Sequence, residues 1–168
     1  MAAGSPQTLQ RRSEEESACP DSWGCALRGE LAEPLAGELP SPAGSVWAIP
    51  FTGDDLMELR ELVATWAGRE ALTFDGIQDL VLAVHEIATN SVRHGGGEGL
   101  LKMWRDGESL VCDIQDRGHI ANPQVGRIRP GAAPDCSRGM WIANQLCDLV
   151  QVSCSSRGSR VRLHKRIS

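Results

Sequence analysis

The sequence of residues 75–97, DGIQDLVLAVHEIATNSVRHGGG, predicts a helix that decides the fold. Its apolar side chains recur every three or four residues, as they do on the buried stripe of an amphipathic helix. Asp75 is the predicted N-cap, with Gln78 three residues later, and the run Gly95–Gly97 ends the helix and allows a sharp reversal. The stripe comprises Ile77, Leu80, Val81, Val84, Ile87, Ala88 and Ser91.

Glu86 and Asn90 lie beside this stripe and are four residues apart, so they are stacked on one face of the predicted helix. A carboxylate and a carboxamide in this arrangement can polarise an attacking hydroxyl group and hold a hydrated Mg²⁺. The solvated face of an ordinary amphipathic helix contains similar pairs. The helix alone therefore leaves both interpretations open.

Composition limits the classes of function. A chain of 168 residues accommodates one domain with a tail, and a net charge of −5 argues against a general nucleic-acid binder. The N-terminus lacks the apolar region of a signal peptide, and no apolar run approaches the ~20 residues of a membrane span. The six cysteines form no CxxC pair. We therefore expect a cytoplasmic protein with reduced thiols, with Cys112 and Cys154 as small residues of predicted strands.

Residues 1–43 differ from the rest of the chain. They hold five of the nine prolines and the acidic run Glu14–Glu16. Residues 1–50 carry three arginines against seven acidic residues, a net charge of −4. This composition predicts a disordered or loosely ordered leader, in which Trp23 and Leu27 are candidates for docking elsewhere. The predicted folded domain is then residues 44–168.

The remaining segments alternate between strand and helix patterns. Asp54 or Thr52 is the predicted cap of the first helix, and Asp106-Gly107 is a typical turn of a short hairpin. This order predicts an α/β (α+β) fold, a two-layer sandwich with a mainly antiparallel mixed sheet and helices on one face. The predicted strands are residues 46–51, 100–104, 109–115, 149–154 and 159–166, and the predicted helices besides 75–97 are residues 54–69 and 140–147.

Basic residues alternate along the last predicted strand. Arg160, Arg162, His164 and Arg166 share one face of it, and Ser159, Val161 and Leu163 share the other. We expect the basic face to be solvated, because a sheet with helices on one side has its other side in water.

Two further segments suggest a ligand site. Asp116 follows the apolar row of Leu110, Cys112 and Ile114, so a carboxylate stands where this strand leaves the sheet. Residues 118–137 contain three prolines and three glycines without periodicity, which is typical of a functional lid or a disordered insertion. The run Ser137–Gly139 then opens a helix whose free N–H groups form a potential anion site.

Taken together, these motifs resemble the GHKL ATPases of the Bergerat fold, and most closely the anti-sigma-factor serine/threonine-protein kinases. HEIATNSVRHG (residues 85–95) is similar to their N box, DRG (116–118) to their G1 box, and SRGMWIANQLCDLV (137–150) to their G2 box. The resemblance extends from about Val46 to Ile167, and the N box is its most specific part.

The resemblance implies ATP and Mg²⁺ as cofactors. Glu86 would polarise the nucleophile, Asn90 would bind Mg²⁺, and Asp116 would accept the adenine amino group. Gly118 would allow close approach of the backbone to the base, and Gly139 would bind phosphate. The other residues implied at the ATP site are Arg93, His94, Ser137, Arg138, Met140 and Ser159.

The resemblance also implies partners, namely a sigma factor and an anti-anti-sigma protein of the STAS type, whose serine would be phosphorylated. It implies a possible homodimer and no direct contact with nucleic acid or membrane. Two positions depart from the family pattern. The G1 box of the family often reads DxGxG, whereas residues 116–120 read DRGHI and lack the second glycine, and the G2 box has one glycine, Gly139. The alternative is therefore an ATP-sensing protein-binding module without kinase activity. His85 is expected to be structural, because the chain has no separate dimerising helix for a phosphoacceptor histidine.

Overall fold

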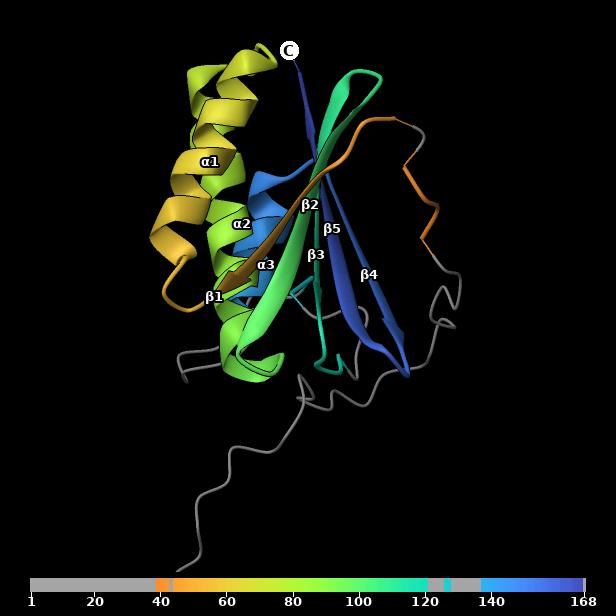
Figure 1. Cartoon of the computed structure of the whole chain (residues 1–168). Coiled ribbons are helices and arrows are strands. Elements are labelled where there is room, and N and C mark those ends of the chain that lie inside the picture. Colours follow the sequence, from red (N-terminus) through yellow and green to blue (C-terminus); the bar gives the residue numbers. More distant parts are fainter. Residues whose placement is uncertain (1–38, 43, 121–125, 128–136, 168) are drawn as a thin grey trace, which may run out of the picture.

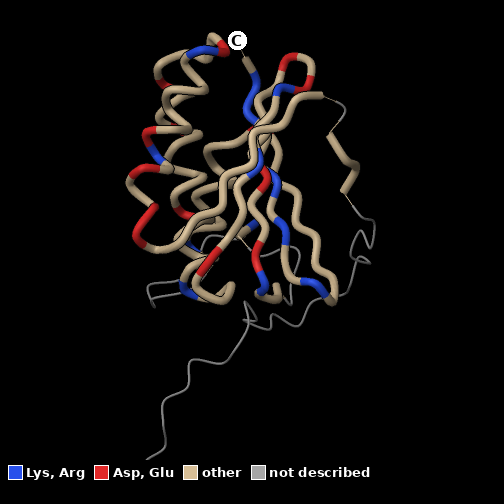
Figure 2. The backbone as a smooth tube through the Cα atoms, viewed as in Figure 1, with Lys and Arg blue, Asp and Glu red and all other residues tan. Residues whose placement is uncertain are grey.

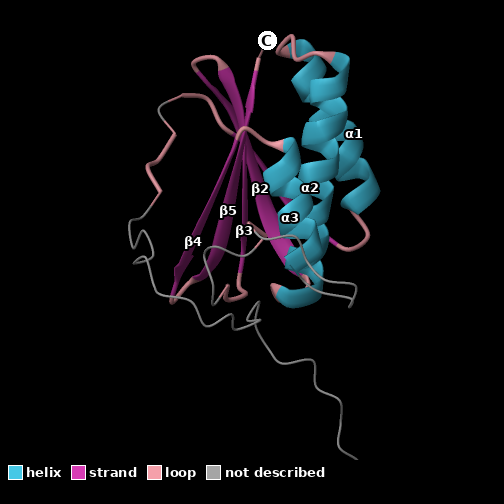
Figure 3. Cartoon of the chain, turned by 180° about the vertical axis from the view of Figure 1, so that it is seen from behind, coloured by secondary structure: helices cyan, strands magenta, loops and turns pink. Residues whose placement is uncertain are grey.

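Three helices cover one face of a five-stranded sheet, as the sequence predicted (Figures 1 and 3). The computed structural model describes residues 39–42, 44–120, 126–127 and 137–167, so most of the predicted leader and lid lies outside the described residues. The elements in chain order are β1 (Trp47–Thr52), α1 (Leu56–Arg69), α2 (Phe74–His94), β2 (Glu98–Asp106), β3 (Ser109–Asp116), α3 (Ser137–Leu146), β4 (Leu149–Ser155) and β5 (Gly158–Arg166).

The sheet has the strand order β1-β2-β3-β5-β4, and every neighbouring pair is antiparallel. β3 and β5 are therefore adjacent although α3 and β4 separate them in the sequence. Their register places Asp116 at the end of β3 opposite Ser159 near the start of β5. Two predicted ligand residues from distant segments thus meet where the adjacent strands β3 and β5 leave the sheet.

α2 is the central helix of the helical layer and contacts both α1 and α3. Its predicted stripe faces the core, where Leu80, Ile87 and Ala88 are fully buried. The predicted cap was wrong by two residues, because Thr73 is the N-cap and its hydroxyl accepts a 3.2 Å hydrogen bond from the Gly76 amide. Asp75 lies inside the first turn, where a carboxylate stabilises the positive end of the helix dipole.

The predicted caps of α1 were also wrong. Asp55 occupies the N-cap position, and its side chain forms no hydrogen bond to the helix. Its carboxylate instead accepts 2.8 Å hydrogen bonds from the amide and the hydroxyl group of Thr52. These two bonds hold the pKa of Asp55 below its ordinary value and close the turn between β1 and α1.

The core lies between the helices and the inner face of the sheet. Cys112 is fully buried there, as predicted, and burial raises the pKa of its thiol well above the ordinary value. Cys154 is half-buried, and its sulfur atom lies 3.2 Å from the carbonyl oxygen of Ile120. No helix in the described part of the chain is long and apolar enough to cross a membrane.

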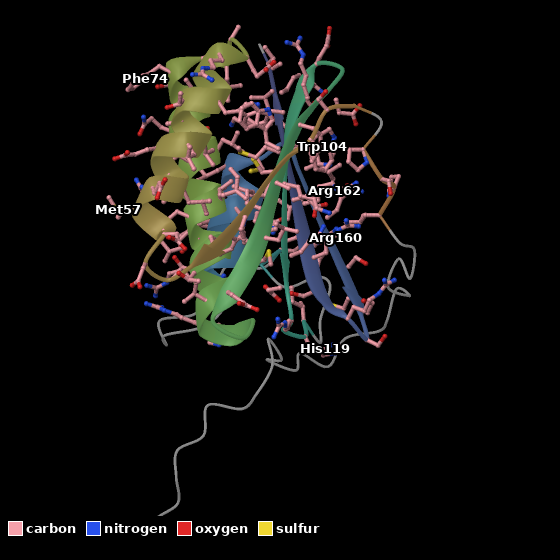
Figure 4. All side chains as sticks on the ribbon, viewed as in Figure 1. Met57, Phe74, Trp104, His119, Arg160 and Arg162 are labelled. Carbon is pink, nitrogen blue, oxygen red and sulfur yellow. The ribbon has the colours of Figure 1, made fainter. Side chains whose placement is uncertain are left out.

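The outer face of the sheet differs from the prediction. Arg166 is exposed, but the side chain of Arg162 is buried among its neighbours (Figure 4). The cause is Asp113 on β3, which lies opposite Arg162 and accepts a 2.8 Å hydrogen bond from its Nε atom. The expectation of a wholly solvated basic face was wrong because it considered β5 without its neighbour.

Candidate functional site

Glu86 and Asn90 of α2 converge on the first turn of α3. A Cβ atom added at Gly139 would lie 2.9 Å from Nδ2 of Asn90 and 3.0 Å from Oε2 of Glu86. Both side chains therefore end at the first turn of α3, and a methyl group at position 139 would require those ends to shift. Asn90 is buried, and its Nδ2 atom has no hydrogen-bond partner among the described residues. A buried, unpaired amide group directed at a helix N-terminus is typical of a ligand site.

The carboxylate of Asp116 is held by three donors at the end of β3. Its Oδ1 atom accepts hydrogen bonds from the Ser159 hydroxyl at 2.6 Å and from the Gly118 amide at 2.8 Å. Its Oδ2 atom accepts one from the Ser91 hydroxyl at 2.6 Å. A carboxylate has about four lone-pair positions, so one position on Oδ2 remains for a ligand donor.

Three glycines allow the backbone to close around this carboxylate. A Cβ atom at Gly95 would lie 2.5 Å from Cγ of Asp116, and one at Gly118 would lie 2.8 Å from the His94 carbonyl oxygen. Gly158 has a φ of +131°, and a side chain there would collide with the Asp116 backbone. The Arg117 amide also donates a 3.0 Å hydrogen bond to the Gly95 carbonyl, which ties the DRG turn to the end of α2.

Ser91, Gly95 and Gly158 were not predicted as site residues. Ser91 had a signal in the sequence, because it was the one polar member of the apolar stripe of α2. Its hydroxyl also donates to the Ile87 carbonyl at 3.2 Å. Such a bond is common within helices, so it gives no indication of the bond from Ser91 to Asp116. The position of Gly158 against Asp116 depends on strand register, which the sequence does not reveal.

The other predicted residues surround the same region in different ways. Ser137 is half-buried and Arg138 is exposed at the start of α3, whereas Met140 is fully buried and its side chain belongs to the core. Gly126, in the predicted lid, has a φ of +79°, and a Cβ atom there would lie 2.5 Å from the Met140 carbonyl carbon. This loop residue therefore packs on the first turn of α3.

One arginine and three histidines lie around the site. Arg93 and His94 are exposed in the last turn of α2, and His119 is exposed beyond the DRG turn (Figure 4). His85 is half-buried beside Glu86, and burial together with the positive charge of Arg60 lowers its pKa. A neutral imidazole in this position fits the structural role predicted for it.

The donor set fits Mg²⁺ rather than a metal with dedicated protein ligands. The described residues contain no group of three or more histidine, cysteine, aspartate or glutamate side chains that could hold a metal ion. The carboxylate of Glu86 provides oxygen atoms at Gly139, and the carboxamide of Asn90, whose Nδ2 atom faces Gly139, would supply its Oδ1 atom to the metal. Mg²⁺ prefers oxygen ligands and usually combines one or two protein groups with waters and substrate phosphates.

A separate cavity opens at the edge of the sheet near β1. Its volume is about 510 Å³, and Pro50, Phe51, Leu100 and Gln115 are among its lining residues. It shares Asp116 with the site, but neither Glu86 nor Asn90 lines it. We therefore locate the candidate site on the helical side of Asp116, where its carboxylate meets Ser91.

The family model of the Histidine kinase-like ATPase domain matches residues 49–165. The chain therefore belongs to this family of GHKL ATPases, and family membership implies binding of ATP. No curated protein matches the sequence significantly.

A solved structure also matches, the RsbU and RsbW domains of Rv1364c from Mycobacterium tuberculosis, with a TM-score of 0.53 and 18% sequence identity. The match covers 76% of this chain but only 33% of that chain. At this identity the likeness shows the shared fold.

Proposed function

We propose that this chain is an anti-sigma regulatory factor that binds ATP with Mg²⁺ and phosphorylates a serine of an anti-anti-sigma partner. The observation that carries the proposal is the convergence of Glu86 and Asn90 on Gly139. In this proposal the phosphates lie against the N-terminus of α3, between Ser137 and Met140, and the adenine base lies at Asp116. The partial positive charge of a helix N-terminus stabilises phosphate oxygens.

Adenine recognition follows from the hydrogen bonds of Asp116. Ser91, Ser159 and the Gly118 amide fix the carboxylate, and the remaining lone pair on Oδ2 accepts the exocyclic amino group. Gly118 and Gly95 permit close approach of the backbone at this end. The rim of the proposed site carries three exposed cationic or titratable side chains that are placed to meet phosphate oxygens, namely Arg93, His94 and Arg138.

Phosphoryl transfer then depends on Glu86. Its carboxylate accepts the proton of the partner's serine hydroxyl while the serine oxygen attacks the γ-phosphorus and ADP leaves. Asn90 would hold Mg²⁺, which would supply positive charge to neutralise the phosphates. Most of the rate enhancement comes from positioning, because phosphoryl transfer needs little covalent help from the protein.

The partners belong to the same proposal. The factor sequesters a sigma factor in the cytoplasm, as a possible homodimer, until an unphosphorylated STAS-type protein displaces it. The solved neighbour supports this assignment, since it contains RsbU and RsbW domains. Neither nucleic acid nor membrane takes part directly.

Calorimetry tests the nucleotide site. ATP is titrated with and without Mg²⁺ into the wild type, Asn90→Ala and Gln78→Ala, the last being an exposed carboxamide on α2 outside the site. We expect Mg²⁺-dependent binding that Asn90→Ala abolishes and Gln78→Ala retains. Absence of ATP binding by the wild type, or equal binding by Asn90→Ala, would contradict the proposal.

The alternative is an ATP-sensing binding module without kinase activity. The G1 box favours it, because residues 116–120 read DRGHI and buried Ile120 stands where the family pattern DxGxG has its second glycine. Labelled ATP incubated with the protein and STAS-type candidates separates the two functions. Phosphate transfer that Glu86→Gln suppresses supports the kinase, whereas ATP-dependent complex formation without transfer supports the module.

A further inference from the structure

The outer face of the sheet is buried at its centre although all three helices lie on the other face. Trp104 is 4% exposed, Arg162 is 3% exposed and Val111 is fully buried. Figure 4 shows Trp104, Arg160 and Arg162 on the side of the sheet away from the helices. A sheet covered on one side only would leave these positions in water. Contacts on the outer side of the sheet therefore cover these side chains.

A charged cluster lies among these side chains. The buried carboxylate of Asp113 accepts hydrogen bonds from Nε of Arg160 at 3.0 Å, Nε of Arg162 at 2.8 Å and Nε2 of Gln115 at 2.8 Å. The Arg162 guanidinium also lies 5.0 Å from the ring centre of Trp104. Its Nη2 atom is buried and has no hydrogen-bond partner among the described residues. A buried guanidinium nitrogen without a partner indicates that an acceptor is supplied from outside them.

The chain itself arrives at this cluster. The Leu39 carbonyl accepts a 3.5 Å hydrogen bond from Nη1 of Arg160. From there residues 39–46, apart from residue 43, pass along the outer side of the sheet into β1, as both views of the chain show (Figures 1 and 3). The described part of the chain therefore starts at the outer face, where residues 1–38 join it.

The sequence before Leu39 complements this face. Trp23, Leu27, Leu31, Leu35 and Leu39 recur at every fourth position, and residues 1–38 carry three arginines against seven acidic residues. The outer face is apolar and basic. Leu149 is 48% exposed at its edge, and basic residues recur along β5, where Figure 2 marks their positions in blue. Its cations Lys102, Arg160, Arg162 and Arg166 face two acids, Asp106 and Asp113.

We propose that residues 23–38 dock on the outer face of the sheet of the same molecule, with the leucine series against Trp104 and Leu149 and the glutamates toward the arginines. The length of the segment suffices. Sixteen residues in an extended conformation span roughly 50 Å, whereas five strands spaced by about 4.8 Å span roughly 20 Å. An acceptor from this segment satisfies Nη2 of Arg162. The leader is then an intramolecular strap rather than a free tail.

Hydrogen exchange on the full chain tests the strap. We expect amides of residues 27–38 to exchange at least tenfold more slowly than an unstructured peptide. The double variant Leu31→Ser/Leu35→Ser removes this protection, and so does Leu149→Ser on the edge strand. The matched control Ala32→Ser/Ala36→Ser lies in the same segment off the leucine series and retains it.

Three results would overturn the proposal. Exchange of residues 27–38 at the unprotected rate in the wild type shows that no strap exists. Equal loss of protection in the alanine control shows that the leucine series is not the contact. Protection that grows with protein concentration, together with a dimer in light scattering, places the segment on a second copy instead. Unchanged far-ultraviolet circular dichroism confirms that each variant is folded.

Discussion

Replacement of Asp116 by asparagine isolates adenine recognition. Three donors already occupy the carboxylate, and the one remaining lone pair is on Oδ2, next to the Ser91 hydroxyl. Adenine presents an amino donor where guanine presents a carbonyl acceptor. A hydrogen bond to a charged group contributes about 1.5–3 kcal/mol, and 1.4 kcal/mol corresponds to a tenfold change in affinity. We therefore expect Asp116→Asn to reduce the preference for ATP over GTP by roughly 10- to 100-fold.

Calorimetry with both nucleotides measures this ratio for the wild type, Asp116→Asn and Asp106→Asn. The last variant removes an exposed carboxylate of the β2–β3 hairpin and is expected to leave the ratio unchanged. Ser159→Ala removes one of the three donors and leaves the acceptor, so it should reduce the preference for ATP over GTP less than Asp116→Asn does. An unchanged ratio in Asp116→Asn, with ATP and GTP weakened equally, would refute the assignment of Asp116 to adenine.

Three further perturbations test other parts of the molecule. Gly139→Ala places a methyl group against the ends of the Asn90 and Glu86 side chains, which must shift, so ATP binding should weaken by about 1 kcal/mol, the low end of overpacking costs, and adenosine binding should not change in the same titration. Asp113→Asn leaves buried Arg162 without its counter-charge and should cost about 3–5 kcal/mol in urea unfolding, whereas Asp113→Leu/Arg162→Met should cost less. Burial lowers the pKa values of His85 and His164, so the unfolded state binds more protons than the folded state below about pH 6.5. The urea concentration at the unfolding midpoint should therefore decrease as the pH is lowered from 7 to 5. Glutamine at both positions should make this decrease smaller. A smaller loss of stability in Asp113→Asn than in the double variant, or a pH slope that the glutamines leave unchanged, would contradict the last two expectations.

The parts of the fold that could be predicted are those with a local signal. The stripe of α2 is an i, i+3, i+4 pattern within one segment, so the helix and its buried face followed from the sequence alone. Asp106-Gly107 likewise identified the β2–β3 hairpin, which the pairing of Asp106 with Ser109 confirms. The caps were less predictable, because Thr73 and Asp55 compete with neighbouring side chains of similar capping propensity.

The contacts that could not be predicted join strands that are distant in sequence. Arg162 carries no local mark that distinguishes it from exposed Arg166. It is buried because β5 pairs with β3 in a register that places it opposite Asp113. The same register brings Ser159 to Asp116, which the resemblance to a known family suggested but no spacing within the chain implied.

These two pairings depend on each other. Asp113 and Asp116 lie on one strand, three residues apart, and therefore on opposite faces of the sheet. A slip of β5 by one residue would turn Arg162 into the core and Ser159 away from Asp116, because successive side chains alternate between faces. The ion pairs of Asp113 with Arg160 and Arg162 make that slip unfavourable, since the cations would enter the apolar core unpaired. The charged cluster on the outer face thus fixes the strand register that aligns Asp116, the carboxylate that we propose binds adenine, on the inner face.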